Sequence, residues 1–225
     1  MRLATGCSAI DALLEGGIES GTVTDLYGGG GSGKTNLCLQ LAKNVALQGS
    51  KVIYIDTEGV SIERLNQIAG EDSEKVMSNV LFFRAHSYAE QERFLQKAIK
   101  LSFTENMDVK LLIVDSLTIF YRALLKDEDE KNVSSRLGNQ LIHMLKLARK
   151  KDIPVVVTTQ VYQSQEKNQP VGGHILYHSA KTIIELDEIG PHIRLARIIK
   201  HRSIAEKQSV EFKITNDGLV PLGND

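Results

Sequence analysis

The sequence predicts an α/β fold, in which a mostly parallel, twisted sheet carries helices on both faces and ends in an antiparallel extension near the C-terminus. Two observations predict it. Short, continuously apolar runs alternate with helical patterns over the first 160 residues, which is typical of a parallel sheet buried on both faces. A glycine-rich loop also joins the first of these apolar runs to the first long helix, as in phosphate-binding loops.

The elements follow from the spacing of apolar residues. The strands expected in the parallel part are residues 22–27, 51–56, 79–84, 110–115 and 153–159. Helices are expected over residues 33–47, 89–103 and 133–150, where apolar residues recur at helical spacing. After Gln160, residues 183–186, 192–200 and 209–215 read as strands with short connections, and we expect them to continue the sheet as its antiparallel edge. The charged run at residues 126–131 predicts a solvated loop between helices.

Composition limits the classes of protein. The chain has 225 residues, 42% of them hydrophobic, so we expect a single domain over residues 1–225 with a sizeable core. Its 27 basic and 28 acidic residues give a net charge of −1, so contact with DNA must come from a local patch. No apolar run reaches the roughly 18 residues of a membrane span, and residues 1–10 lack the long apolar stretch of a secretion signal. We therefore expect a cytoplasmic protein without a membrane partner.

The two cysteines, Cys7 and Cys38, are too few for a disulfide framework or a metal cluster. We expect both of them to be small buried thiols.

The loop before the first long helix fits the pattern G-x-x-x-x-G-K-[ST]. Its glycines let main-chain N–H groups converge on phosphate oxygens, and the start of the helix adds partial positive charge. The lysine can reach the β- and γ-phosphates of a nucleoside triphosphate, and the threonine hydroxyl can ligate Mg²⁺. The predicted binding residues for ATP and Mg²⁺ are Gly28, Gly29, Gly30, Gly31, Ser32, Gly33, Lys34 and Thr35.

The same stretch also fits G-x-G-x-x-G, with Asp56 where a dinucleotide-binding fold places its ribose acid. A nicotinamide-dependent enzyme is therefore an alternative. That fold does not need Lys34 and Thr35, nor an apolar strand that ends in Asp115. In a nucleoside triphosphatase, Asp115 holds the water shell of Mg²⁺, so the triphosphatase is the favoured interpretation.

Two further polar residues follow strands that end at the same edge of the sheet. Glu58 lies just after the strand 51–56, where a carboxylate can lie over the γ-phosphate and activate water. Gln160 ends the strand 153–159, where it can sense the γ-phosphate and pass its state to the following loop. The predicted catalytic residues are Glu58, Lys34 and Gln160.

Taken together, these motifs resemble the RecA superfamily, and in particular its archaeal recombinase branch. The resemblance is carried, in order, by residues 8–27, the GGGGSGKT loop, YIDTEG at 54–59, ERL at 63–65, LLIVDSLT at 111–118, VVTTQV at 156–161 and PVGGHILYHSA at 170–180. It implies a RecA-like P-loop NTPase core. It matches Glu58 to the water-activating glutamate, Asp115 to the Walker B aspartate, Gln160 to the switch before the second DNA-facing loop, and Arg64 to an arginine that stacks on adenine.

We expect the core to begin near Leu3, without the N-terminal helical DNA-binding domain of a full recombinase, so the chain resembles a core-only recombinase paralogue. This resemblance implies ATP and DNA binding, weak ATPase activity, little or no strand exchange, and an accessory role in homologous recombination and DNA repair. It implies single-stranded or branched DNA, the main recombinase and a Holliday-junction resolvase as partners. The sequence leaves open whether the chain forms a homo-oligomer.

DNA contacts are expected at two places. The polar segment 161–173 predicts a mobile loop, but it carries one cation, Lys167, offset by Glu166, which argues against strong strand exchange. A basic cluster follows in residues 192–213, and Lys200, His201 and Arg202 fall where two strands join. We expect these three side chains to project from a hairpin tip and contact phosphates. A solvated edge strand guarded by charge, or a contact with the ATP of a neighbouring subunit, remains open.

Two other functions stay open at this stage. The same active-site residues permit an active DNA-dependent ATPase and strand-exchange recombinase. A small-molecule kinase would need an arginine-rich lid between late helices, but that region reads KDEDEK and is mostly acidic.

Overall fold

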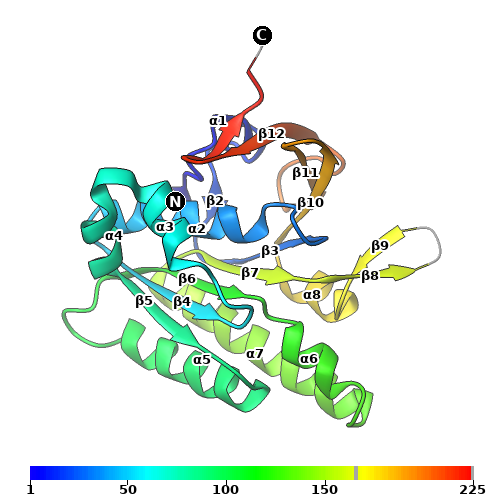
Figure 1. Ribbon diagram of the computed structural model, residues 1–225. Coiled ribbons are helices and arrows are strands. Elements are labelled where there is room, and N and C mark those ends of the chain that lie inside the picture. Colours follow the sequence, from blue (N-terminus) through cyan, green and yellow to red (C-terminus); the bar gives the residue numbers. More distant parts are fainter. Residues whose placement is uncertain (165–166, 224–225) are drawn as a thin grey trace.

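The chain alternates strands and helices over most of its length (Figure 1). The computed structural model describes residues 1–164 and 167–223, and only the backbone of 163, 164 and 167–169. Its strands are β1 (Arg2–Leu3), β2 (Ile18–Glu19), β3 (Val23–Gly28), β4 (Lys51–Asp56), β5 (Val80–Arg84), β6 (Val109–Asp115), β7 (Val155–Thr159), β8 (Val161–Ser164), β9 (Lys167–Pro170), β10 (Thr182–Gly190), β11 (Ile193–Lys200), β12 (Ser209–Thr215) and β13 (Gly218–Pro221). Its helices are α1 (Ser8–Leu13), α2 (Lys34–Leu47), α3 (Ile62–Ala69), the 3-10 helix η1 (Gly70–Asp72), α4 (Ser73–Asn79), α5 (Tyr88–Ser102), α6 (Ile119–Leu124), α7 (Glu130–Lys151) and α8 (Gly173–Ser179).

Within the described residues, the main sheet has nine strands in the order β13-β12-β11-β10-β3-β7-β6-β4-β5. The strands from β10 to β5 in this order are parallel to their neighbours. The strands β11, β12 and β13 are antiparallel and continue the sheet beyond β10. The predicted fold class, a mostly parallel sheet with a C-terminal antiparallel extension, is confirmed.

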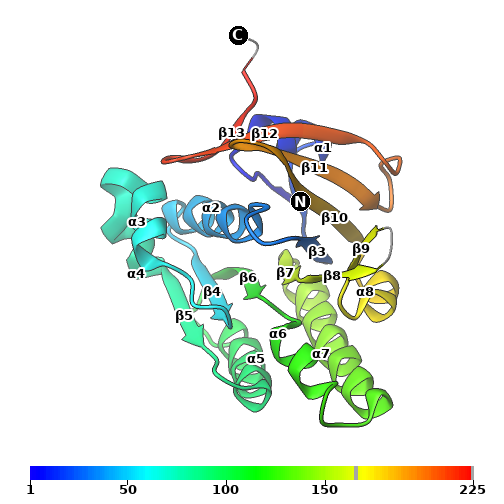
Figure 2. The same cartoon turned by 45° about the vertical axis from the view of Figure 1, so that its right-hand side comes forward.

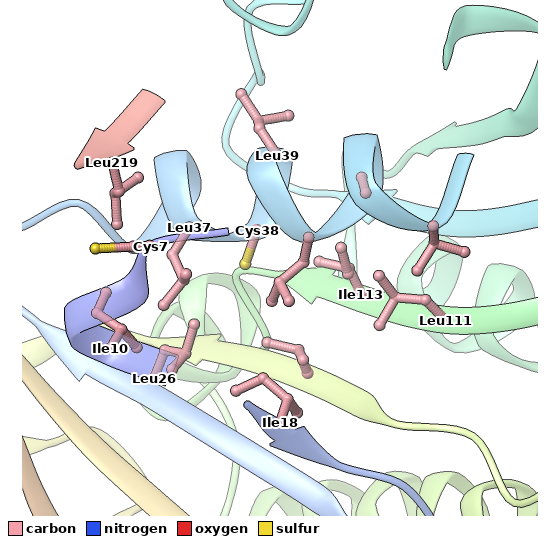
Figure 3. Close-up of a cluster of buried hydrophobic side chains, with 14 of the residues drawn as sticks. Cys7, Ile10, Ile18, Leu26, Leu37, Cys38, Leu39, Leu111, Ile113 and Leu219 are labelled. Atoms are coloured by element: carbon pink, nitrogen blue, oxygen red, sulfur yellow. The ribbon is translucent and has the colours of Figure 1, made fainter. Parts of the chain in front are cut away.

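Two helical layers cover the two faces of the sheet (Figure 2). Alternate residues of one strand supply both cores, because successive side chains of a strand point to opposite faces. Leu111 and Ile113 of β6 pack with α1, α2, α3 and α4, whereas Leu112 and Val114 pack with α5, α6, α7 and α8. Figure 3 shows the first core, in which side chains of α2 lie against β6.

Both cysteines are free and fully buried in this first core, as expected. Burial raises the pKa of the Cys38 thiol well above its ordinary value, so the thiolate is disfavoured. Among the described helices, none combines the length and the apolar character that crossing a membrane requires.

The structure differs from the sequence prediction after Gln160. The segment 161–173 was predicted to be a mobile loop, but β8 and β9 pair as an antiparallel hairpin from Val161↔Pro170 to Ser164↔Lys167. The helix α8 then begins at Gly173. Main-chain pairing of this kind needs no apolar pattern, so the polar composition did not reveal it. Glu166 and the side chain of Lys167, for which a charge balance was predicted, lie outside the described residues.

The sheet order gathers the candidate residues at one edge. Asp56 and Asp115 are paired in register at the carboxyl ends of β4 and β6. The strand β3 ends in Gly28 at the start of the glycine-rich loop, and β7 ends one residue before Gln160. Ligands of open parallel sheets bind beyond the carboxyl ends of the strands, so this edge is where a site is expected.

Candidate nucleotide-binding site

The glycine-rich loop connects β3 to α2, and its glycines are not equivalent. A methyl group on Gly28 would lie 2.0 Å from the carbonyl oxygen of Leu186. Gly31 and Gly33 adopt φ values of +74° and +101°, which favour glycine. In contrast, nothing lies within 4 Å of the position of a Cβ on Gly29 or Gly30. Gly28, Gly31 and Gly33 are therefore needed to fold the loop, whereas Gly29 and Gly30 have free space at their Cβ positions.

Lys34 is the first residue of α2, and its ammonium group folds back over the loop. It donates hydrogen bonds to the carbonyl oxygens of Gly28 at 2.8 Å and Gly29 at 2.7 Å, and to Ser32 Oγ at 3.3 Å. Burial lowers the pKa of this lysine, while the charges of Glu58 and Asp115 act in the opposite direction. A phosphate at the loop can take over these hydrogen bonds from the three neutral acceptors, because a charged acceptor binds an ammonium group more strongly.

The residues predicted to hold Mg²⁺ offer the hard oxygen ligands that this ion prefers. Thr35 lies in the first turn of α2, and Asp115 ends β6 with 1% of its surface exposed. One carboxylate oxygen of Asp115 accepts a hydrogen bond from the Tyr54 hydroxyl at 2.7 Å, and the other accepts one from the Thr158 hydroxyl. Each oxygen keeps acceptor capacity for a water molecule, so this donor set fits a role in the water shell of Mg²⁺.

Glu58 and Gln160, which were predicted separately, lie together in the structure. The Gln160 side-chain amide donates a hydrogen bond of 2.8 Å to Glu58 Oε1. The turn that carries Glu58 is held by Asp56, whose carboxylate accepts hydrogen bonds from the main-chain N–H groups of Glu58, Gly59 and Val60 at 3.1, 2.8 and 2.9 Å. Because these amides already occupy the Asp56 carboxylate, the structure does not favour its alternative role as the ribose acid of a dinucleotide fold.

Arg64 lies beside the start of α2. Its guanidinium donates to Asn36 Oδ1 at 2.7 Å and to the carbonyl oxygens of Thr215 and Asn216 at 2.6 and 2.9 Å. Burial lowers its pKa. The arginine thus joins α2 to the turn between β12 and β13. Its stacking on adenine stays a prediction.

The three residues predicted to contact DNA do not project freely from a hairpin tip. Lys200 donates to the carbonyl oxygens of Tyr177 and Ala180 at the end of α8. Arg202 forms an ion pair of 3.0 Å with Glu19, although its side chain is 58% exposed. The prediction that these side chains project freely is wrong, because carbonyl oxygens bind Lys200 and a carboxylate pairs with Arg202, both from distant parts of the chain.

His201 is held even more firmly. Its Nδ1 accepts hydrogen bonds from the main-chain N–H groups of Ser203 and Ile204, both at 3.1 Å. The proton of the neutral ring is therefore on Nε2, which faces Glu19 Oε2 at 3.9 Å. Burial lowers the pKa of His201, so the ring favours its neutral form and serves the packing of this loop.

Sequence reasoning missed Asp25, a fully buried acid in β3. It accepts a hydrogen bond of 3.0 Å from the Thr159 hydroxyl, and its other oxygen has no partner among the described residues. Burial raises the pKa of Asp25 to about 7, and Lys34 opposes the shift. The signal was the charged residue in a short strand expected at the centre of the sheet, because a buried acid calls for a specific environment.

Comparisons with known proteins agree with the geometry. Residues 1–221 match the Rad51 family. A protein from Methanococcoides burtonii, described as "DNA repair and recombination protein RadB", is 47% identical over 97% of both chains. One from Archaeoglobus fulgidus with the same description is 44% identical over 98% of this chain and 99% of that protein. A solved structure, "Crystal structure of the RadB recombinase", has a TM-score of 0.84 and 36% identity over 99% of this chain and 100% of that one. The RecA-like fold expected from the sequence is therefore confirmed.

Proposed function

Because this chain belongs to the Rad51 family and to its RadB group, we propose that it is an ATP- and DNA-binding accessory protein of homologous recombination and DNA repair. It acts as one RecA-like ATP-binding domain, hydrolyses ATP weakly and performs little or no strand exchange. The observation that supports this proposal best is the hydrogen bond between Glu58 and Gln160, because it joins the nucleotide site to the β8–β9 hairpin, which follows β7.

The site residues divide the binding of ATP among them. The main-chain N–H groups of the loop and the Lys34 ammonium hold the triphosphate. Thr35 and Asp115 hold Mg²⁺, which neutralises phosphate charge when bound. Glu58 orients a water molecule toward the γ-phosphate. Arg64 contacts the adenine after it gives up one of its main-chain acceptors.

Gln160 is placed to transmit the state of the nucleotide. Its carbonyl oxygen accepts a hydrogen bond of 2.8 Å from Val171 N, which closes the base of the β8–β9 hairpin. Its own N–H donates to the Thr118 hydroxyl at 3.2 Å. A γ-phosphate that competes for the Gln160 side chain therefore acts on the residue from which both strands of the hairpin depart. ATP then biases the position of the hairpin by binding one arrangement better than the other.

DNA binding is proposed at the β8–β9 hairpin and at Lys200, His201 and Arg202, where β11 ends. Among Lys200, His201 and Arg202, the side chain of Arg202 is exposed enough to contact a phosphate. A DNA phosphate can replace Glu19 as its ion-pair partner. The proposed DNA is single-stranded or branched. The proposed protein partners are the main recombinase, a Holliday-junction resolvase and, by self-association, further copies of this chain.

The test is DNA affinity measured with MgATP, with MgADP and without nucleotide, on single-stranded and branched DNA. We expect the affinity to change with the nucleotide. Identical affinities in all three states would refute the proposal. An Arg202→Ala variant is expected to weaken binding modestly and to lower the salt dependence by about one phosphate contact, with Lys207→Ala as the control on the same connection.

The complete set of Lys34, Glu58, Asp115 and Gln160 also permits a second function, an active DNA-dependent ATPase and strand-exchange recombinase. The two functions differ in turnover. Strong stimulation of ATP hydrolysis by single-stranded DNA, together with strand exchange, favours the second function. Slow hydrolysis that DNA leaves unchanged favours the accessory role.

A further inference from the structure

The end of the β10–β11 hairpin lies against the glycine-rich loop, and one arginine makes the contact. Arg194, the second residue of β11, donates a hydrogen bond from Nε to the carbonyl oxygen of Gly31 at 2.7 Å. Its side chain is only 11% exposed. Arg194 and Gly31 are 163 residues apart in the sequence, so this contact exists only because the antiparallel extension returns to the phosphate loop.

The rest of the guanidinium is fixed to the hairpin itself. Nη2 forms an ion pair of 3.3 Å with Glu188, and Nη1 donates to the carbonyl oxygens of Gly190 at 3.4 Å and Ile193 at 3.1 Å. Three of its nitrogens are thus engaged, and the planar group is held in one orientation. Because each of its three nitrogens already has a partner on the protein, we assign this guanidinium no direct contact with phosphate. It is a rigid arm from the hairpin to the loop.

The geometry of the peptide bond gives this arm a consequence for anion binding. In a trans peptide the C=O and the following N–H point in opposite directions. Holding the Gly31 carbonyl outward on Arg194 therefore turns the N–H of Ser32 inward. The structure agrees, because Ser32 N points back across the loop toward the carbonyl oxygen of Gly29 at 3.4 Å. That long and weak hydrogen bond leaves the N–H available to a better acceptor.

We propose that Arg194, anchored by Glu188, is a positioning residue that fixes the Gly31–Ser32 peptide plane and so prepares the phosphate loop to bind the nucleotide. The proposal rests on ATP binding at this loop, the function proposed above. Without the arm, the φ and ψ angles of Gly31 are free to vary, since glycine has few conformational restrictions. The loop must then lose this freedom when it binds phosphate, and affinity falls.

The chain offers a matched control on the same pair of strands. Arg197 and Glu185 face each other in the β10–β11 ladder and form an ion pair of 2.7 Å. Arg194 and Glu188 face each other three positions along the same ladder. The two pairs share their chemistry and their strands, but Arg194 donates a hydrogen bond to Gly31 of the phosphate loop, whereas Arg197 pairs with Glu185 within the ladder. Comparing them separates an effect on the loop from an effect on the stability of the hairpin.

The experiment measures the dissociation constant of MgATP for the wild type, Arg194→Lys, Glu188→Gln and Arg197→Lys by calorimetric titration. Lysine keeps the charge at position 194 but cannot hold Gly31 and Glu188 with one planar group. We expect Arg194→Lys to bind MgATP about tenfold more weakly, as for the loss of one charge-assisted hydrogen bond. Glu188→Gln should lose less, and Arg197→Lys should bind as the wild type does.

A second measurement needs no nucleotide. Hydrogen exchange of a peptide that covers the phosphate loop should be faster in Arg194→Lys than in the wild type, and unchanged in Arg197→Lys. The melting temperature of each variant shows whether it folds. Wild-type affinity together with wild-type exchange in a folded Arg194→Lys protein would overturn the proposal, as would equal losses in Arg194→Lys and Arg197→Lys. If the wild type itself binds no MgATP, the proposed function fails, and hydrogen exchange alone tests the positioning role. Faster exchange of the loop in Arg194→Lys then supports that role, and unchanged exchange overturns it.

Discussion

Tyr54 gives a direct way to measure how the buried Walker-type aspartate is held. Its ring is fully buried, and its hydroxyl donates a hydrogen bond of 2.7 Å to Asp115 Oδ2. A Tyr54→Phe substitution removes this hydroxyl but keeps the ring and its contact with Phe82, whose centroid is 5.2 Å away. The packing is preserved, so the change in stability reports the hydrogen bond.

The expected magnitude follows from the nature of the acceptor. A hydrogen bond to a charged group is worth about 1.5–3 kcal/mol, and the carboxylate oxygen that loses it is buried. We expect the free energy of unfolding to fall by about 2 kcal/mol. For a protein of this size, each kcal/mol shifts the melting temperature by about 2–4 °C, so the expected decrease is about 4–8 °C.

The assay is urea denaturation together with scanning calorimetry, without nucleotide. Tyr121→Phe is the control, because its hydroxyl contacts a neutral partner, Ser134 Oγ, at 3.1 Å, and its loss should cost about 1 kcal/mol. A Tyr54→Phe protein within about 0.5 kcal/mol of the wild type, a change that surface substitutions also produce, would refute the view that this hydroxyl stabilises a buried charge.

Three further predictions concern the loop, the buried acid and the switch. Gly28→Ala should destabilise the fold and abolish MgATP binding, because its methyl group meets a main-chain oxygen at 2.0 Å, whereas Gly30→Ala, which meets nothing within 4 Å, should fold normally; melting curves of both variants test this. Burial raises the pKa of Asp25 from 3.8 to about 7 in the folded state, so its ionisation costs stability as the pH rises through that interval. The free energy of unfolding of Asp25→Asn should therefore rise relative to that of the wild type as the pH increases from about 4 to about 7, by about 2–4 kcal/mol in total. The difference should stay constant at higher pH, and denaturation at each pH measures it. Gln160→Ala, which removes the hydrogen bond to Glu58, should bind DNA with an affinity that no longer depends on ATP, and a retained dependence would exclude this switch.

The sequence predicted the central strands closely because their side chains are buried on both faces. The strand predicted at residues 51–56 is β4, and the strand predicted at 110–115 is β6, which begins one residue earlier. Short helices such as α3 and α8 were not predicted, because six to eight residues give too little periodicity and packing decides their conformation. Even so, α3 carries a readable signal, since Ser61 caps it by accepting a hydrogen bond from Arg64 N.

The start of α7 shows how a charge run can mislead. The helix was predicted from residue 133, and the acidic stretch before it was assigned to a solvated loop. In the structure the helix begins at Glu130, with Asp129 accepting a hydrogen bond from Asn132 N. An acid at the N-cap followed by glutamate in the first turn favours a helix start. A prediction that included these capping residues would have placed the start of the helix about one turn earlier.

The site was predictable residue by residue but not as pairs. Lys34 and Glu58 follow strands at the carboxyl edge and Asp115 ends one there, and that position alone indicates a role. The contact of Gln160 with Glu58, and that of Arg194 with Gly31, depends on the order of strands in the sheet. Strand order is a property of the whole fold, and no local pattern in the chain encodes it.

The central claim is that main-chain amides of the glycine-rich loop, with Lys34 as counter-ion, bind the phosphates of ATP. Calorimetric titration of MgATP into the wild type and a Lys34→Ala variant tests it most directly. The account predicts saturable binding at one site per chain for the wild type and loss of that binding for a folded Lys34→Ala protein. A wild type that binds no MgATP, or a variant that binds it equally well, would contradict the account.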